Sequence, residues 1–373
     1  MTQFAETPDQ VLLRDTILRY LTRSYSFEER RKIANSPLGW SPEHWADFAK
    51  LGLLGAAVPE EAGGFATGVR EAQIVMEAFG RHLVIEPYLE TAVLAAELIL
   101  RLGSADQRDS LLGPLLAGDE LWAVALELDE VVGRAPRILA RRTGAGYRLE
   151  GHWPLVHAAP FAGRLLVMAR LDDALGERAL FVVDRDAEGV ALETLETIDG
   201  RRAADVRLLE VRVPAEARLG ADRIEAVVHG ALQRAVGLQC AEAVGIMARL
   251  NEMTLEHART RVQFGQPIGR FQVLQHRLVD MYIAHREAAA TTSALAWAPP
   301  SGTNVQPDYG SMAKVKVAKA AKFIGEQAVQ IHGGMGMTDE LAVGHCVKRL
   351  MALSAQLGGA DHHLDCLADA LMS

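Results

Sequence analysis

The sequence predicts an α+β protein in three parts: an N-terminal helical domain over residues 1–120, a middle antiparallel β-sheet or small barrel over residues 121–225, and a C-terminal four-helix bundle over residues 226–373. Three observations lead to this division. Apolar residues recur three and four apart in the first and last parts. Short apolar runs of strand length occupy the middle part. The 373 residues also exceed the size at which one hydrophobic core keeps growing.

The helices of the first part are expected to begin at capping residues. Residues 7–10 (Thr-Pro-Asp-Gln) form a capping box with proline at the first helical position. Ser41, followed by Pro-Glu, repeats this start, and Ser104 does so with Gln107 three residues later. Apolar residues at helical spacing then predict two more helices, at residues 71–79 and 91–102.

The middle part has the features of a sheet built from hairpins. Apolar runs cover residues 121–126, 165–169 and 179–183, and turn signals lie at residues 143–146 and 199–200. Parallel strands usually need a helical crossover, and no ten-residue helical pattern separates these runs. The strands are therefore expected to pair antiparallel.

Long helices return in the last part. One stripe in steps of four and three, apolar except for Gln239, predicts a packed helix through Leu232, Val236, Gln239, Ala243, Ile246, Leu250 and Met253. Three more helices are predicted at about residues 271–297, 309–331 and 341–353, and residues 298–307, which contain three prolines, are the linker candidate. Long helices with short links favour a four-helix bundle.

Net charge, cysteine content and the lack of targeting or metal-binding patterns limit the functions and cellular locations that the sequence allows. A formal net charge of −9 argues against a nucleic-acid partner. Cys240, Cys346 and Cys366 are odd in number and far apart, which predicts small, buried, reduced thiols. The N-terminus lacks the pattern of a signal peptide, no apolar stretch is long enough to span a bilayer, and no histidines have metal-ligand spacing. A cytoplasmic protein without a metal site is predicted.

The residues from Ala258 to Leu278 are the first candidate for a ligand site. They comprise a helix end with arginines, a Gly/Pro turn and a helix start with two glutamines. Guanidinium groups bind phosphate oxygens well, so an anionic ligand is expected. The residues alone favour a solvated cation at a helix C-terminus for Arg261, and they allow Gly333 and Gly334 to form a helix end and turn as well as to contact a ligand.

Three motifs in a fixed order together resemble the acyl-CoA dehydrogenase family over nearly the whole chain. They are the Leu-Gly-Leu-Leu-Gly…Gly-Gly run of residues 51–64, Arg261-x-x-Phe264-Gly265, and the Gln-Ile-His-Gly-Gly-Met-Gly-Met-Thr run of residues 330–338. The resemblance implies an FAD enzyme that removes a proton and a hydride from an acyl-CoA, with electron-transferring flavoprotein as acceptor. It also implies FAD contacts across a dimer or tetramer interface, made by Arg261, Phe264, Phe271, Gln272, Gln330, Gly333 and Gly334.

The sequence departs from the family pattern at the flavin and at the base. The family's Thr-Glu-Pro-x-x-Gly-Ser segment falls on residues 125–133, and its Trp-Ile-Thr segment falls on residues 155–157; neither matches. The position of the usual catalytic glutamate falls on Gly358, and the alternative position falls near Ala235. The catalytic residue is therefore unknown, and glycine and alanine cannot act as bases.

Two nearby acids are candidates for the missing base. Asp361 follows Gly359, but it also suits an N-cap of a helix that begins at His362. Glu242 lies on the first bundle helix, where an exposed structural role is the alternative.

The runs at residues 240–245 and 359–364 look similar to the small subunits of heteromeric acyl-CoA dehydrogenases, such as that of pimeloyl-CoA dehydrogenase. In related two-subunit enzymes of steroid side-chain breakdown, one chain carries the base while the other completes the FAD site. The leading hypothesis is such a subunit, working with a homologous chain in fatty acid or steroid degradation. A silent scaffold or regulatory subunit and a self-sufficient homodimer with a displaced base are the alternatives.

Overall fold

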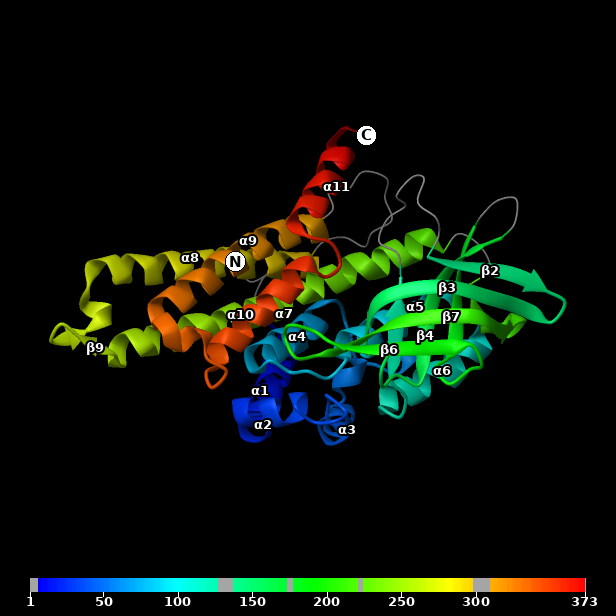
Figure 1. Ribbon diagram of the computed structural model, residues 1–373, viewed down its shortest axis with the longest axis horizontal. Helices are drawn as coiled ribbons and strands as arrows, with labels where there is room; N and C mark the ends of the chain where they lie inside the picture. Colours follow the sequence, from blue (N-terminus) through cyan, green and yellow to red (C-terminus); the bar gives the residue numbers. More distant parts are fainter. Residues whose placement is uncertain (1–5, 127–136, 173–176, 221–223, 298–308, 373) are drawn as a thin grey trace. The chain divides into compact units, whose positions relative to one another are not determined.

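The computed structural model describes residues 6–126, 137–172, 177–220, 224–297 and 309–372 (Figure 1). It confirms the predicted order of helical, β and helical parts. The chain folds into two compact units, each of which is built from segments that are distant in the sequence. Unit 1 comprises Met1–Lys32, Gly68–Val84 and Val236–Ser373, and unit 2 comprises Ile33–Thr67 and Ile85–Ala235.

The first helices of unit 1 begin as the sequence predicts. They are α1 (Pro8–Ser24), α2 (Phe27–Ala34) and α4 (Arg70–His82). The Thr7 side chain accepts a hydrogen bond from the Gln10 backbone, and the Gln10 side chain accepts one from the Thr7 backbone, which completes the capping box. The Gln10 amide also donates to Glu71 Oε1 of α4 at 2.9 Å. The Gln10 side chain, which belongs to the capping box, therefore also links α1 to α4.

The four predicted bundle helices are present, and a fifth follows them. They are α7 (Glu225–Thr260), α8 (Gln272–Ala294), which the 3-10 turn η6 (Leu295–Trp297) continues, α9 (Tyr309–His332), α10 (Ala342–Ala355) and α11 (Ala360–Met372). In Figure 1, α8, α9 and α10 run alongside α7. Their core is built from small and medium apolar side chains, among them Ala243, Ile246, Leu250, Met281, Val317, Ile324 and Leu350.

Glycine permits an unusually close approach of α4 and α7. A Cβ on Gly80 would overlap the carbonyl oxygen of Glu242 and lie 3.0 Å from its Cα. A Cβ on Gly245 would overlap the carbonyl oxygen of Glu77 and lie 3.0 Å from the Arg81 amide nitrogen. Each helix thus presents a glycine to the other helix's backbone, one turn away from the other contact. Any side chain at either position would push the two helices apart.

Unit 2 begins with short helices that include a π-helical segment. They are α3 (Pro42–Lys50), the 3-10 turns η1 (Leu53–Gly55) and η2 (Glu60–Ala62), the π-helix η3 (Leu89–Ala95), α5 (Ala96–Leu102) and α6 (Ala105–Ala117). Ser41 and Ser104 are N-caps as predicted, the latter in a capping box. The stretch expected as one α-helix at residues 91–102 is therefore part π-helix. There, the Thr91 hydroxyl bonds both the amide and the carbonyl of Trp122.

Among the described residues, one eight-stranded sheet has the order β6-β7-β3-β2-β4-β5-β8, with β1 beside β4. Its strands are β1 (Trp122–Ala125), β2 (Ile138–Thr143), β3 (Gly146–His157), β4 (Arg164–Leu171), β5 (Arg178–Asp184), β6 (Val190–Glu196), β7 (Arg202–Pro214) and β8 (Arg218–Leu219), the last after the 3-10 turn η4 (Ala215–Ala217). Most pairs are antiparallel as predicted, but β4 pairs parallel with both β1 and β2. The prediction excluded parallel pairs because parallel strands usually need a helical crossover. Here, strands make up the described parts of the connections.

The sheet packs around its own apolar core, and the cysteines lie in the helices. Ala123, Leu149, Leu165, Phe181 and Val206 are among the residues that fill the sheet's core. None of the three cysteines forms a disulfide: Cys240 and Cys346 are buried as predicted, while Cys366 is half-buried. Every helix within the described ranges is too short or too polar to cross a membrane.

Candidate functional site

The turn after α7 is a two-residue hairpin that carries Phe264 at its tip. Strand β9 (Val262–Gln263) pairs antiparallel with β10 (Gln266–Pro267). Between them, Phe264 and Gly265 have φ values of +52° and +79°, as a type I′ turn requires. A phenylalanine rarely adopts this conformation, and here its side chain is 92% exposed. The hairpin therefore holds an aromatic ring out in solvent, where a ligand or a partner chain can contact it.

Arg261 closes the base of this hairpin through its backbone. Its N–H donates to the His257 carbonyl at 2.9 Å, and its carbonyl accepts from the Ile268 N–H at 2.8 Å. The guanidinium is exposed and forms no ion pair with any residue in the described ranges. After the 3-10 turn η5 (Ile268–Arg270), Phe271 packs edge-to-face on Phe264 with ring centroids 6.1 Å apart. The exposed Gln272 then begins α8.

The end of α9 lies beside the end of α7, because the rings of His257 and His332 stack with centroids 4.4 Å apart. Gln330 is exposed in the last turn of α9, and Gly333 has φ of +63° at the start of the 3-10 turn η7 (Gly333–Met337). A Cβ on Gly333 or Gly334 would meet nothing within 4 Å. These glycines thus do form a helix end, and open space also lies beside them. The turn after α7 and the end of α9, which carry the two groups of predicted FAD contacts, therefore lie at the same end of the bundle.

Arg261 contributes positive charge at this end of the bundle, because its guanidinium has no acidic partner within the described part of the chain. The pKa of His257 is lowered, first by burial and then by His332 and Arg261. A neutral His257 leaves the Arg261 guanidinium, together with the exposed Arg259 and Arg270, as the cations next to the turn. An anion such as a phosphate is the ligand that complements a guanidinium in this setting.

A groove of about 740 Å³ adjoins Gln330. Its floor is apolar, and Lys319 and Lys322 of α9 are on its border. The lining comes from α9, α10 and the start of α11: Ala318, Lys319, Ala321, Lys322, Gly325, Glu326, Val329, Gln330, Val347, Leu350, Met351, Ser354 and Ala360. The volume is within the range of pockets that bind small molecules.

The two segments that depart from the family's flavin contacts lie in unit 2. Of residues 125–133, only Ala125 and Leu126 fall within the described part of the chain. At residues 155–157, the β3–β7 pairing shifts register between Trp153 and Val156. Leu155 has φ of +53° there, and its N–H donates to Asp205 Oδ1 at 2.8 Å. Such an irregularity redirects the side chains that follow it.

The positions at which the family places its base hold no carboxylate. Gly358 lies between α10 and α11 with φ of +89°, and Ala235 is buried on α7. Asp361 is exposed in the first turn of α11. The prediction that it caps a helix beginning at His362 is wrong, because α11 begins at Ala360. An acid in a first helical turn is favoured by the helix dipole whether or not it has another role.

Glu242 has a fixed structural partner. Its carboxylate receives two hydrogen bonds from the Arg349 guanidinium, Nε to Oε1 at 2.7 Å and Nη2 to Oε2 at 2.8 Å. The exposed fractions are 2% for Glu242 and 4% for Arg349. The expectation of an exposed helix residue is therefore wrong: apolar packing of α7 against its neighbours buries this face. Both oxygens are occupied, which argues against a free base.

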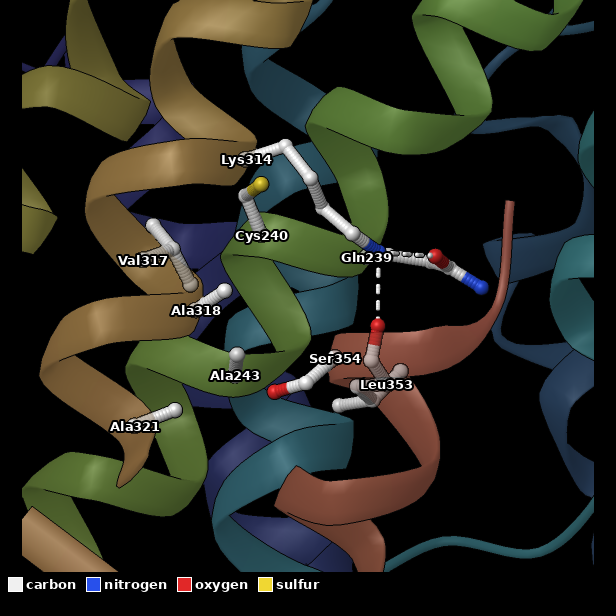
Figure 2. A pocket seen from close by; sticks show the side chains of 9 residues that line it. All are labelled: Gln239, Cys240, Ala243, Lys314, Val317, Ala318, Ala321, Leu353 and Ser354. Atoms are coloured by element: carbon white, nitrogen blue, oxygen red, sulfur yellow. Dashed lines mark hydrogen bonds between the residues drawn. The ribbon is translucent and has the colours of Figure 1, made fainter. Parts of the chain in front are cut away.

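A buried lysine near this pair was not predicted from the sequence. Lys314 of α9 is 2% exposed, and it points into a cavity of about 10 Å³, near the lower limit for one water. Figure 2 shows its Nζ bonded to Gln239 Oε1 of α7 and to the Leu353 carbonyl of α10. Burial lowers its pKa to about 8, and the nearby Cys240 opposes that shift. The signal was available, since Lys314 falls on the apolar stripe of α9.

The fold and the residues at the bundle end define the class of protein. Residues 7–119 match the N-terminal domain of acyl-CoA dehydrogenase, and residues 226–372 match the C-terminal domain of acyl-CoA dehydrogenase. The chain belongs to the acyl-CoA dehydrogenase family, whose members are FAD-dependent oxidoreductases.

Similar proteins include assemblies of two chains. The acyl-CoA dehydrogenase FadE27 of Mycobacterium tuberculosis is 32% identical over 348 residues, which cover 90% of each chain. A chain of the ChsE4–ChsE5 complex from Mycobacterium tuberculosis is 30% identical with a TM-score of 0.89, covering 100% of this chain and 99% of that one. A chain of the steroid ACAD Tcur3481–Tcur3483 is 29% identical with a TM-score of 0.86, and 98% of both chains are covered.

Proposed function

We propose that this chain is one subunit of an FAD-dependent acyl-CoA dehydrogenase that desaturates an acyl-CoA between Cα and Cβ together with a second, homologous chain. The observation that carries the proposal is the absence of a carboxylate at Gly358 and at Ala235, combined with a bundle end that retains Arg261, Gly333 and Gly334. A weakly acidic C–H loses its proton only to a well-placed base. The second chain is proposed to supply that base.

The residues at the bundle end fit FAD. An exposed guanidinium that pairs with no acid among the described residues suits a diphosphate, and the open space beside Gly333 and Gly334 allows a ligand to approach the backbone. Phe264, Phe271, Gln272 and Gln330 are proposed to complete the contacts from the same end of the bundle. When bound, FAD supplies the acceptor for the hydride that leaves Cβ. The chain's own part is to hold the cofactor's anionic portion for a neighbouring subunit.

The similar proteins support a two-chain assembly and a fatty or steroid acyl-CoA as substrate. ChsE4 and ChsE5 form a complex, and Tcur3481–Tcur3483 is a steroid ACAD. By analogy, a fatty or steroid acyl-CoA is the proposed substrate, a dimer or tetramer is the proposed assembly, and electron-transferring flavoprotein is the proposed acceptor. A cytoplasmic location is part of the same proposal.

A self-sufficient homodimer is the second candidate, because Asp361 is exposed three residues after Gly358. To separate the two candidates, the chain is purified alone and, in parallel, after co-expression with a homologous acyl-CoA dehydrogenase chain. We expect turnover of acyl-CoA with an electron acceptor only from the co-expressed pair. Flavin bleaching by the chain alone, lost in Asp361→Asn, would establish the homodimer. A pair that neither holds flavin nor turns over would leave a scaffold role.

The cofactor assignment has its own test in Arg261→Gln. Loss of a charge-assisted hydrogen bond to a phosphate is expected to weaken FAD binding about 10- to 150-fold. Arg259→Gln is the matched control, because Arg259 is also exposed near the end of α7 but lies outside the motif. Flavin retention through gel filtration and fluorescence titration with FAD measure the effect. Equal FAD affinity in both variants would refute the role of Arg261.

A further inference from the structure

The segment between α10 and α11, Gln356–Gly359, is held by buried polar groups of α9. Lys314 Nζ donates to the Gln356 carbonyl at 2.7 Å, in addition to the Leu353 carbonyl at 2.6 Å and Gln239 Oε1 at 3.2 Å. An ammonium group has three N–H donors, so each of them has an acceptor. Two of these acceptors lie at the C-terminal end of α10, where the helix dipole favours a cation.

A second connection runs from the same helix, one turn earlier. Ser311 Oγ lies 2.7 Å from His363 Nδ1, and His363 Nε2 lies 2.8 Å from the Leu357 carbonyl. Because a carbonyl can only accept, Nε2 carries a proton and donates it. His363 is 1% exposed, so this connection is shielded from water. The carbonyls of residues 356 and 357 are thus both fixed by side chains from outside the segment.

The segment has a backbone conformation that requires such fixing. Leu357 has φ of +52° and Gly358 has φ of +89°. A left-handed conformation is unfavourable for a leucine, so neighbouring groups must maintain it. A Cβ on Gly358 would overlap the His362 ring and lie 2.9 Å from His363 Nε2. The side-chain direction at position 358 therefore points at the histidines of α11.

We propose that Lys314 and His363 are positioning residues that hold Gln356–Gly359 in one conformation, in which position 358 presents its backbone to the acyl-CoA site and cannot present a carboxylate. The inference rests on the proposed function, in which position 358 stands where the family places the base that acts on the acyl-CoA. It deepens that function, because the missing base is then a property of the segment's backbone and not of one side chain. A glutamate introduced at this position would be aimed at α11, and it would disturb the hydrogen bond from His363 to Leu357.

The first test measures the segment itself by amide hydrogen exchange on the full chain with its partner. Lys314→Met is expected to increase exchange about tenfold or more at residues 357–363, while helix α7 keeps its protection. Lys316→Met is the matched control on the same helix, where the lysine is half-exposed and paired with Glu287. Ser311→Ala removes only the second connection and is expected to give a smaller increase at the same amides. Ser311→Ala provides the test by itself if Lys314→Met does not fold. Unchanged exchange in the folded variants would overturn the proposal, whatever the protein's activity.

The second test uses turnover. Lys314→Met is expected to lower kcat about tenfold or more, because position 358 loses its fixed conformation, with the FAD content changed less than about threefold, because the residues proposed to contact FAD are unchanged. Gly358→Glu is expected to confer no turnover on the chain alone and to increase exchange at residues 357–363. Dehydrogenation gained by Gly358→Glu with an undisturbed segment would overturn the proposal. Absence of turnover in every wild-type preparation would count against the proposed function, and the exchange result would still decide the positioning role.

Discussion

Glu242→Gln gives the sharpest separation between a structural and a catalytic role for that residue. The change removes the charge that balances Arg349, which is 4% exposed and bound through two hydrogen bonds. Breaking a buried ion pair from one side costs about 3–5 kcal/mol, because the other charge stays buried and unpaired. At about 2–4 °C per kcal/mol for a unit of this size class, the melting temperature is expected to fall by about 6–20 °C.

The measurement is urea and thermal unfolding followed by far-UV circular dichroism. Glu252→Gln is the matched control on the same helix, since its pair with Arg81 is partly exposed and is worth about 1 kcal/mol or less. The double variant Glu242→Leu with Arg349→Met is expected to recover most of the loss, because it leaves no unpaired charge. A Glu242→Gln protein with wild-type stability and no turnover would refute this reasoning and make Glu242 a catalytic residue.

Two other predictions concern packing and pH. Gly245→Ala is expected to destabilise the protein by about 1–3 kcal/mol, because its Cβ would overlap the Glu77 carbonyl. In the control Gly230→Ala on the same helix, the new Cβ meets nothing, so this variant should be more stable by up to about 1 kcal/mol. Equal melting temperatures of the two variants would contradict the close approach of α4 and α7. Burial lowers the Lys314 pKa from 10.5 to about 8, so the unfolded chain binds a proton that the folded chain has lost between those pH values. The wild type should therefore gain at most about 3 kcal/mol relative to Lys314→Met as the pH rises across that window, and parallel stability curves from the two proteins would contradict the shift.

Local signals were sufficient for the elements. Capping boxes at Thr7 and Ser104 marked helix starts correctly, because a cap is satisfied within four residues of chain. Periodicity located the bundle helices, but it did not distinguish the π-helical turns of η3 from an α-helix. It also missed the parallel pairings of β4, since strand order depends on contacts between residues far apart in the sequence.

The sequence by itself determined the family and the order of the three parts, because each depends on residue identity at short spacing, and it predicted the motif residues proposed to contact FAD. Only the tertiary structure decided how buried the acids and the lysine are and which groups they contact. Glu242 is occupied because Arg349, more than a hundred positions later, meets it inside the bundle. Lys314 became visible as a positioning residue for the same reason, since its acceptors come from two other helices and the link that follows them. Position 358 is committed to glycine by two histidines that follow it and by a backbone conformation that no spacing rule predicts.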